Sequence, residues 1–89
     1  MPTRFLRIKG KVQGVFYRAS AKKEASKLGI TGWIRNTEEG NVEALVSGDN
    51  VVLDEFTVWC KTGPPLARVS DVMIKEREEE SFTTFSIEH

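Results

Sequence analysis

Hydrophobic and polar side chains alternate along residues 4–12. Leu6, Ile8 and Val12 share one parity, and the lysine and arginine residues between them take the other. A period of two is that of a strand with one buried face and one face in water. The pattern therefore predicts a strand at the start of the chain.

Apolar residues at helical spacing mark two later segments. In the first they are Tyr17, Ala21, Ala25 and Leu28, and in the second they are Val52, Phe56 and Trp59. Spacings of three and four residues place such side chains on one face of a helix. The first helix is predicted over residues 18–28, with Gly29 at its C-terminal cap. The second helix is predicted to end before Gly63-Pro64-Pro65, because proline cannot continue a helix.

Strand patterns return in the remaining segments. Residues 30–36 and 41–48 are joined by a short polar connection that ends in glycine, so they are predicted to form a hairpin. Around Ser70-Asp71 the parity of the apolar residues changes, which predicts a β-bulge within a strand. Residues 85–87 alternate again, as in a short closing strand.

The predicted order is strand, helix, strand, strand, helix, strand, with a short fifth strand. This order is typical of a ferredoxin-like βαββαβ sandwich of the α+β class, in which two helices cover one face of a four- to five-stranded antiparallel sheet. In a split βαβ unit the first two strands run parallel on either side of another strand, so their C-terminal ends share one edge of the sheet. Asn36 ends the second strand and is thereby predicted to lie near the loop after the first.

The stretch from Gly10 to Arg18, which contains that loop, has the residues of an anion-binding cradle. Backbone N–H groups at a helix N-terminus lack internal partners and carry the positive end of the helix dipole, so they attract phosphate or carboxylate. Gly14 permits a positive φ, and Arg18 adds a planar fork of donors that matches phosphate oxygens. Alternatively, Arg18 is a solvated surface residue, Asn36 only forms a turn, and Gln13 either fixes the loop or is exposed.

Length, charge and cysteine content indicate the number of domains, the kinds of partner and the cellular compartment. The 89 residues are expected to form one domain, residues 1–89, around one core. Thirteen basic residues balance thirteen acidic ones, so the positive field that favours nucleic acid binding is missing. Cys60 is the single cysteine and cannot form an internal disulfide, which favours a reducing compartment. No window approaches the roughly 20 apolar residues of a membrane span. We expect a cytoplasmic monomer with neither nucleic acid nor membrane as a partner.

Other kinds of catalytic centre lack their residues in this sequence. A metal site needs three or four ligands, whereas the single cysteine, the terminal His89 and the scattered carboxylates show no ligand spacing. Cys60 lies in the second predicted helix without a residue to activate it as a nucleophile. Gly10 and Gly14 are too close for a Walker motif, and no Gly-Lys-Ser/Thr follows. Neither a metal nor another cofactor is predicted.

Two motifs in this sequence resemble those of the acylphosphatase family. The first is Gly10-x-Val12-Gln13-Gly14-Val15-x-Tyr17-Arg18. The second is Gly32-Trp33-Ile34-Arg35-Asn36-x-x-x-Gly40-x-Val42, with Gly48 after it. Supporting matches in both predicted helices and near the C-terminus extend the resemblance over nearly the whole chain. Two motifs in the correct order are far more specific than either alone.

The resemblance implies hydrolysis of an acyl phosphate to a carboxylate and inorganic phosphate. It also implies that Arg18 binds the phosphate and that Asn36 orients the attacking water. Because the leaving group is a carboxylate, the reaction needs charge stabilisation more than acid catalysis. The partner is then a small acyl phosphate, and inorganic phosphate is expected to inhibit. The backbone N–H groups predicted to bind phosphate are those of Gly14, Val15, Phe16, Tyr17 and Arg18.

Two alternative functions stay open at this point. An RNA-binding module can share the fold, but it stacks bases on aromatic side chains of its central strands, and residues 41–48 contain none. A non-catalytic sensor of phosphorylated metabolites would use the same cradle. Asn36 distinguishes the sensor from the hydrolase, since a sensor needs no oriented water.

Four further residues are predicted to lie in the core, namely Trp33, Phe56, Trp59 and Cys60.

Overall fold

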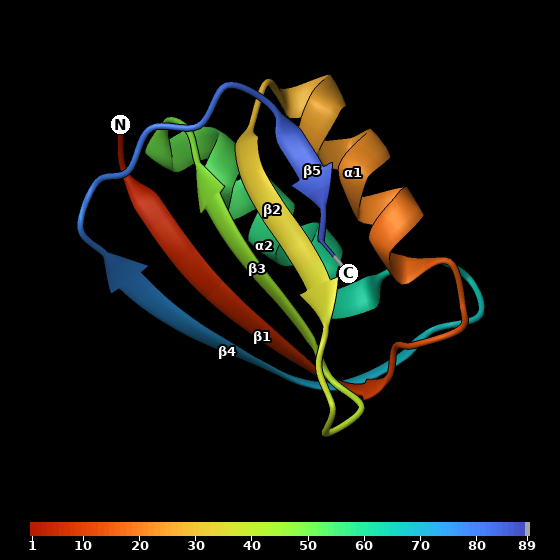
Figure 1. The fold of residues 1–89 in the computed structure, drawn as a ribbon. Helices are drawn as coiled ribbons and strands as arrows, with labels where there is room; N and C mark the ends of the chain where they lie inside the picture. The colour runs from red at the N-terminus through yellow and green to blue at the C-terminus, as the bar shows by residue number, and fades with distance from the viewer. Residues whose placement is uncertain (89) are drawn as a thin grey trace.

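A five-stranded sheet carries two helices on one of its faces (Figure 1). In chain order the elements are β1 (Thr3–Lys11), α1 (Tyr17–Leu28), β2 (Thr31–Asn36), β3 (Val42–Ser47), α2 (Asn50–Thr62), β4 (Arg68–Arg77) and β5 (Phe85–Ile87). The structure is a computed structural model that describes residues 1–88, and His89 lies outside the described residues. Each helix and strand that the sequence predicts is present.

The strand order in the sheet is β4-β1-β3-β2-β5. β3 pairs antiparallel with β1 on one side and with β2 on the other, so β1 and β2 run in the same direction. With two helices on one face, this is the predicted ferredoxin-like α+β fold. The prediction of a wholly antiparallel sheet is wrong at one edge, because β5 pairs in parallel with β2. After β4 the chain crosses the end of the sheet and enters β5 at the end where β2 also begins (Figure 1).

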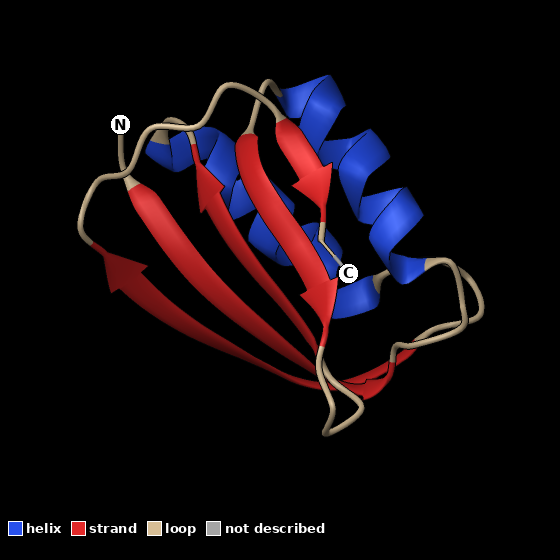
Figure 2. Cartoon of the chain, viewed as in Figure 1, coloured by secondary structure: helices blue, strands red, loops and turns tan. Residues whose placement is uncertain are grey.

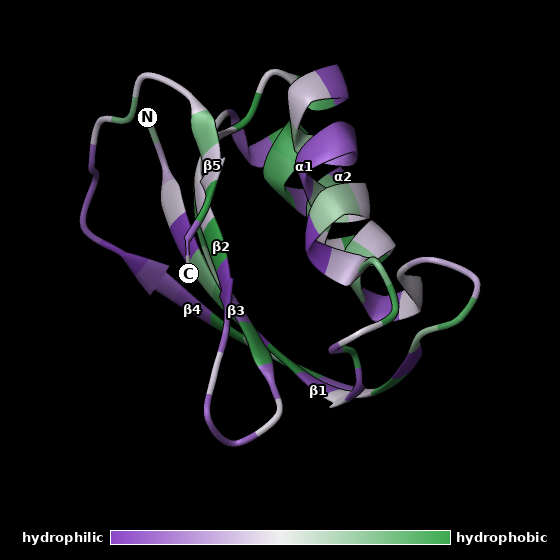
Figure 3. Cartoon of the chain, turned by 45° about the vertical axis from the view of Figure 1, so that its right-hand side comes forward, coloured by the Kyte–Doolittle hydropathy of each residue, from purple (hydrophilic) through white to green (hydrophobic). Residues whose placement is uncertain are grey.

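The core lies between the helices and the sheet face that they cover, and the other face carries no helix (Figure 2 and Figure 3). The inward parity of β1 and the apolar stripe of α1 are buried here, as the sequence predicts. Phe56 and Cys60 of α2 are completely buried, and Trp59 packs against the core while half-buried. The predicted positions of Phe56 and Cys60 are therefore confirmed.

Trp33 lies outside the core, so its predicted position is wrong. Its neighbour Ile34 faces the helices and is 0% exposed, whereas Trp33 is half-buried on the uncovered face. There the guanidinium of Arg35 lies 5.1 Å from the centre of the Trp33 ring. Successive residues of a strand point to opposite faces, so β2 cannot place both Trp33 and Ile34 against the helices.

The predicted bulge in β4 is present and lies opposite the last residues of β1. Lys9 pairs with Asp71, but the next residue, Gly10, pairs with Val69, so Ser70 is the extra residue. A Cβ atom on Gly10 would collide with the backbone of β4, and Gly10 has a φ of 127°. Only glycine therefore allows the two strands to approach so closely just before the loop that follows β1.

Glu43 links three strands on the uncovered face of the sheet. Its carboxylate accepts hydrogen bonds from Nε of Arg7 at 2.9 Å and from a terminal nitrogen of Arg35 at 3.0 Å. The Glu43 side chain is only 10% exposed. Burial by itself raises the pKa of the Glu43 carboxyl, but the hydrogen bonds and charges of the two guanidinium groups outweigh it, so the pKa is lowered.

This arrangement predicts an acid-sensitive contribution of Glu43 to stability. A carboxyl with a lowered folded-state pKa stabilises the fold above its unfolded pKa of about 4.5, and this contribution is lost as pH falls through the folded pKa. We expect Glu43→Gln to be less stable than wild type at neutral pH, and the difference to shrink below about pH 4.5. Urea denaturation across this range measures it, with the exposed Glu38→Gln as control. A constant difference at every pH would contradict the prediction.

Candidate functional site

Three segments meet where β1 and β2 end. Both strands pair antiparallel with β3, so their C-terminal ends lie on the same edge of the sheet. The loop of residues 12–16 leaves β1 at this edge and leads into α1. Asn36, the last residue of β2, shares the parity of buried Ile34 and so faces the side of the sheet that α1 covers. The strand order thus brings Asn36 beside the loop.

The backbone of this loop alternates in the sign of φ. Gly14 has a φ of 73° and Phe16 has a φ of 66°, whereas Val15 between them is not among the residues with positive φ. Alternation of this kind turns successive N–H groups toward one side and forms a concave nest for an anion. Among residues 1–88, Phe16 is the only residue other than glycine with a positive φ. The loop therefore has the backbone shape of an anion site.

The N–H groups at the end of this loop and in the first turn of α1 lack acceptors within residues 1–88. The first bond onto the helix is from the Ser20 N–H to the Phe16 carbonyl, at 3.0 Å. Within residues 1–88, the N–H groups of residues 14–19 donate to no backbone carbonyl, and no side chain caps the helix. The first turn also contains no acidic residue. These donors and the helix dipole together favour a bound anion.

Tyr17 anchors the first turn of α1 to α2. Its ring is buried, and its hydroxyl donates a hydrogen bond of 2.7 Å to the carbonyl of Cys60. Burial raises the pKa of Tyr17 far above its usual value, and the contact with Cys60 adds to this. The Tyr17 side chain therefore holds the helix terminus in place.

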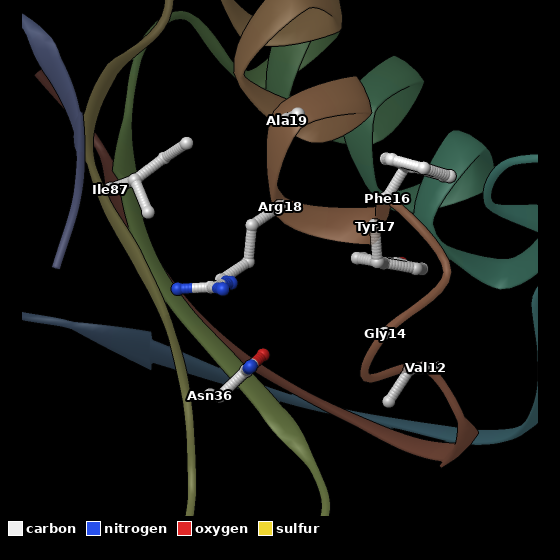
Figure 4. Close-up of a pocket in the computed structure, with 8 residues that line it drawn as sticks. All are labelled: Val12, Gly14, Phe16, Tyr17, Arg18, Ala19, Asn36 and Ile87. Atoms are coloured by element: carbon white, nitrogen blue, oxygen red, sulfur yellow. The ribbon is translucent and has the colours of Figure 1, made fainter. Parts of the chain in front are cut away.

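Arg18 extends from the first turn of α1 toward Asn36 (Figure 4). Within residues 1–88, no carboxylate forms an ion pair with Arg18, although five other ion pairs are present. Its position on the helix terminus directs the guanidinium into the space that the unpaired N–H groups also face. The described residues leave the donor fork of Arg18 to an anion from outside the protein.

Asn36 presents the opposite side of the same space (Figure 4). Its Oδ1 atom is buried and accepts no hydrogen bond from residues 1–88. A buried acceptor without a partner costs about 1–3 kcal/mol, so such atoms in native proteins call for an explanation beyond folding. Residues 1–88 thus leave the Oδ1 acceptor of Asn36 unused.

Together these residues enclose a hollow of about 360 Å³. The predicted site residues Gly14, Phe16, Tyr17, Arg18 and Asn36 line it, and so do Val12, Ala19 and Ile87. Val15 does not line the hollow, because its side chain is buried in the core. Any role of Val15 in the site is therefore confined to its backbone N–H. The alternation of β1 already places Val12 at this end, whereas Ile87 enters through the pairing of β5 with β2, which no sequence pattern reveals.

Gln13 ties the loop to the hairpin that follows Asn36. Its side-chain NH₂ group donates to the carbonyl of Thr37 at 2.8 Å and to the carbonyl of Asn41 at 2.7 Å. The Thr37 N–H in turn donates to the Asn41 carbonyl at 2.9 Å. Of the two possibilities left open by the sequence, Gln13 therefore fixes the loop. It connects the two halves of the site.

Other catalytic arrangements find little support in the described part of the chain. No three of its His, Cys, Asp and Glu residues lie close enough together to hold a metal ion. Cys60 is buried, and burial raises its pKa to about 12, so its thiol stays protonated. His89, the one histidine, lies outside the described residues. Neither helix found in residues 1–88 has the length and hydrophobicity needed to cross a membrane.

Comparison with known proteins agrees with this geometry. The family model described as Acylphosphatase matches residues 4–87. The acylphosphatase of Methylococcus capsulatus is 47% identical over 81 residues, which span 90% of this chain and 88% of that protein. The crystal structure of acylphosphatase from Bacillus subtilis superposes with a TM-score of 0.96 at 34% identity, covering 100% of both chains. An acylphosphatase structure from Coxiella burnetii gives 0.95 at 37% identity, covering 98% of this chain and 92% of that one.

Proposed function

The chain belongs to the acylphosphatase family of enzymes, and we propose how its residues hydrolyse an acyl phosphate. The phosphate group binds in the loop, where the N–H groups of residues 14–18 and the Arg18 guanidinium surround its oxygens. A water molecule held by Asn36 attacks phosphorus on the side opposite the acyl oxygen. The products are a carboxylate and inorganic phosphate.

Arg18 and the loop N–H groups stabilise the negative charge on the phosphate oxygens. Phosphoryl transfer spreads negative charge over three equatorial oxygens, while the attacking and leaving oxygens lie roughly in line. Donors that are already oriented stabilise this charge without reorganising during the reaction. The bond from phosphorus to the acyl oxygen breaks as the water oxygen bonds to phosphorus, and its electron pair leaves with the carboxylate. A carboxylate leaves readily, so no general acid is required.

Asn36 acts on the water molecule. A carboxamide both accepts and donates hydrogen bonds, so it can fix a water in position, but it is not a base. The proton that the water loses therefore passes to a phosphate oxygen of the substrate. The Oδ1 atom of Asn36 supports this role, because no group within residues 1–88 donates a hydrogen bond to that acceptor.

One observation carries the proposal. Arg18 and the N–H groups, from the loop and the first turn of α1, lie at the same hollow as the Asn36 amide, which comes from β2. The cradle alone would suit any phosphate-binding protein, including a sensor. An amide with a free acceptor across from the cradle is what hydrolysis needs in addition.

Benzoyl phosphate hydrolysis in the presence of EDTA tests the proposal. We expect the purified protein to release benzoate and inorganic phosphate well above the spontaneous rate, and the chelator to have no effect. A sensor would bind inorganic phosphate but would leave the rate at its spontaneous value. That result would overturn the hydrolytic function, and loss of activity with EDTA would overturn metal independence.

The bridging role of Gln13 predicts a kinetic effect of its substitution. Gln13→Met keeps the length of the side chain but removes both hydrogen bonds to the hairpin, each worth about 0.5–1.5 kcal/mol. We expect kcat/KM for benzoyl phosphate to fall about tenfold, because the cradle and Asn36 are no longer held in register. Steady-state kinetics measures it, with the exposed Lys11→Ala as control. Unchanged kinetics for Gln13→Met would show that the bridge does not position the site.

Three further proposals accompany the mechanism. Inorganic phosphate should inhibit competitively, because it fills the cradle that the substrate phosphate uses. We also propose that the enzyme is a cytoplasmic monomer that needs no cofactor. The single buried Cys60 is consistent with a reducing compartment.

A further inference from the structure

Phe16 contributes little to the fold and takes an unfavourable conformation. Its side chain is 74% exposed, so the ring gains little from burial. Its φ of 66° and ψ of 22° lie in the left-handed region, where a bulky residue is strained and glycine is not. Glycine would give the same nest at lower cost. The presence of an exposed aromatic ring at this position therefore points to a role outside folding.

The position of Phe16 connects it to the site. It lines the hollow and directly precedes Tyr17 and Arg18, whose N–H groups belong to the proposed phosphate cradle. Figure 4 shows the Phe16 ring and Asn36 on opposite sides of the hollow. Ile87, another apolar residue of the lining, lies on the same side as Asn36 (Figure 4).

In-line attack decides which of these apolar surfaces meets the substrate. The water held by Asn36 and the leaving acyl oxygen lie on opposite sides of phosphorus. The acyl group therefore leads away from Asn36, toward the side of the hollow where Phe16 lies. Ile87 is on the wrong side for this contact.

We propose that the Phe16 ring is the acyl-binding surface and gives the enzyme a preference for acyl phosphates with an aromatic or large apolar acyl group. This inference rests on the proposed function, because it uses the direction of attack from Asn36. Contact with such a group removes apolar surface of the ring from water, and two aromatic rings gain further from stacking. A methyl group, as in acetyl phosphate, covers too little of the ring to benefit.

Two stable analogues test the inference without requiring hydrolysis. Phenacylphosphonate and acetonylphosphonate carry carbon in place of the bridging oxygen and differ only in the phenyl or methyl group. We expect wild type to bind phenacylphosphonate about five- to tenfold more tightly than acetonylphosphonate, and Phe16→Gly to bind both equally. Each variant's ratio of dissociation constants, measured by calorimetry, cancels any change in the cradle itself. Phe16→Asn, which tolerates the left-handed region, should give the same result.

The control is Val58→Ala, which shortens an apolar side chain that is 64% exposed on α2 and does not line the hollow. It should keep the wild-type ratio. If Phe16→Gly and Phe16→Asn also keep it, or if wild type shows no preference, the ring does not bind the acyl group. Failure of the hydrolytic function would appear separately, as phosphonate binding with no turnover of benzoyl phosphate. Thermal unfolding of Phe16→Gly should occur at or above the wild-type temperature, because the strain is relieved.

Discussion

Replacing Arg18 with alanine is expected to lower kcat/KM for benzoyl phosphate by about 10³-fold or more. Among residues 1–88, Arg18 is the only cationic side chain that lines the hollow, so under the proposed mechanism the substitution leaves the backbone N–H groups to hold the phosphate alone. Competitive inhibition by inorganic phosphate should disappear over the accessible concentration range. Steady-state kinetics with and without added phosphate measures both effects.

Two further variants make the Arg18 result specific. Arg18→Lys keeps the charge but loses the planar fork, so it should recover only part of the activity. Lys22→Ala removes an exposed cation from the same helix and should behave like wild type. Because Arg18 forms no ion pair within residues 1–88, Arg18→Ala should change the free energy of unfolding by less than about 0.5 kcal/mol. Phosphate inhibition that survives in Arg18→Ala would contradict the assigned role.

Replacing Asn36 with alanine should lower kcat by about 10²- to 10³-fold while phosphate inhibition stays near its wild-type value. In the proposed mechanism Arg18 binds the phosphate and Asn36 positions the water, so the effects on binding and turnover are expected to separate in this way. The variant should be at least as stable as wild type, because the substitution also removes a buried acceptor that has no partner. Kinetics, phosphate inhibition and urea denaturation of one preparation measure all three quantities.

Asn36→Asp is the matched comparison for this prediction. It keeps the shape of the side chain but places a negative charge against the phosphate, so it should weaken phosphate binding as well as turnover. If Asn36→Ala were fully active, the water would have to be positioned by another group. The family assignment would remain, since it rests on the sequence and the fold rather than on this residue.

Most of the fold could be predicted because its signals are local. The parity of Leu6, Ile8 and Val12, the stripe of α1 and the change of parity around Ser70 each depend on a few neighbouring residues. The closeness of Asn36 to the loop follows from strand order alone. What the sequence could not show depends on distant parts of the chain. β5 is parallel because of the path of the chain after β4, and Trp33 is outside the core because only one sheet face is covered.

For the candidate site, too, some features could be predicted from the sequence and others could not. Its predicted residues could be named because two motifs, one around Arg18 and one around Asn36, resemble those of the acylphosphatase family in the correct order, whereas the first motif alone is a weak signal. The strained backbone of Phe16 could not be predicted, since bulky residues rarely adopt a positive φ. The bridge from Gln13 to the carbonyls of Thr37 and Asn41 joins residues more than 20 positions apart. Contacts between such distant residues produce no periodic pattern in the sequence.

The central claim is that water attacks phosphorus, and hydrolysis of benzoyl phosphate in ¹⁸O-labelled water tests it most directly. Both products are collected after enzymatic turnover and analysed by mass spectrometry. Attack on a phosphate held by Arg18, with water placed by Asn36, predicts one labelled oxygen in inorganic phosphate and none in benzoate. Label in the benzoate would show attack at the acyl carbon and would contradict the mechanism.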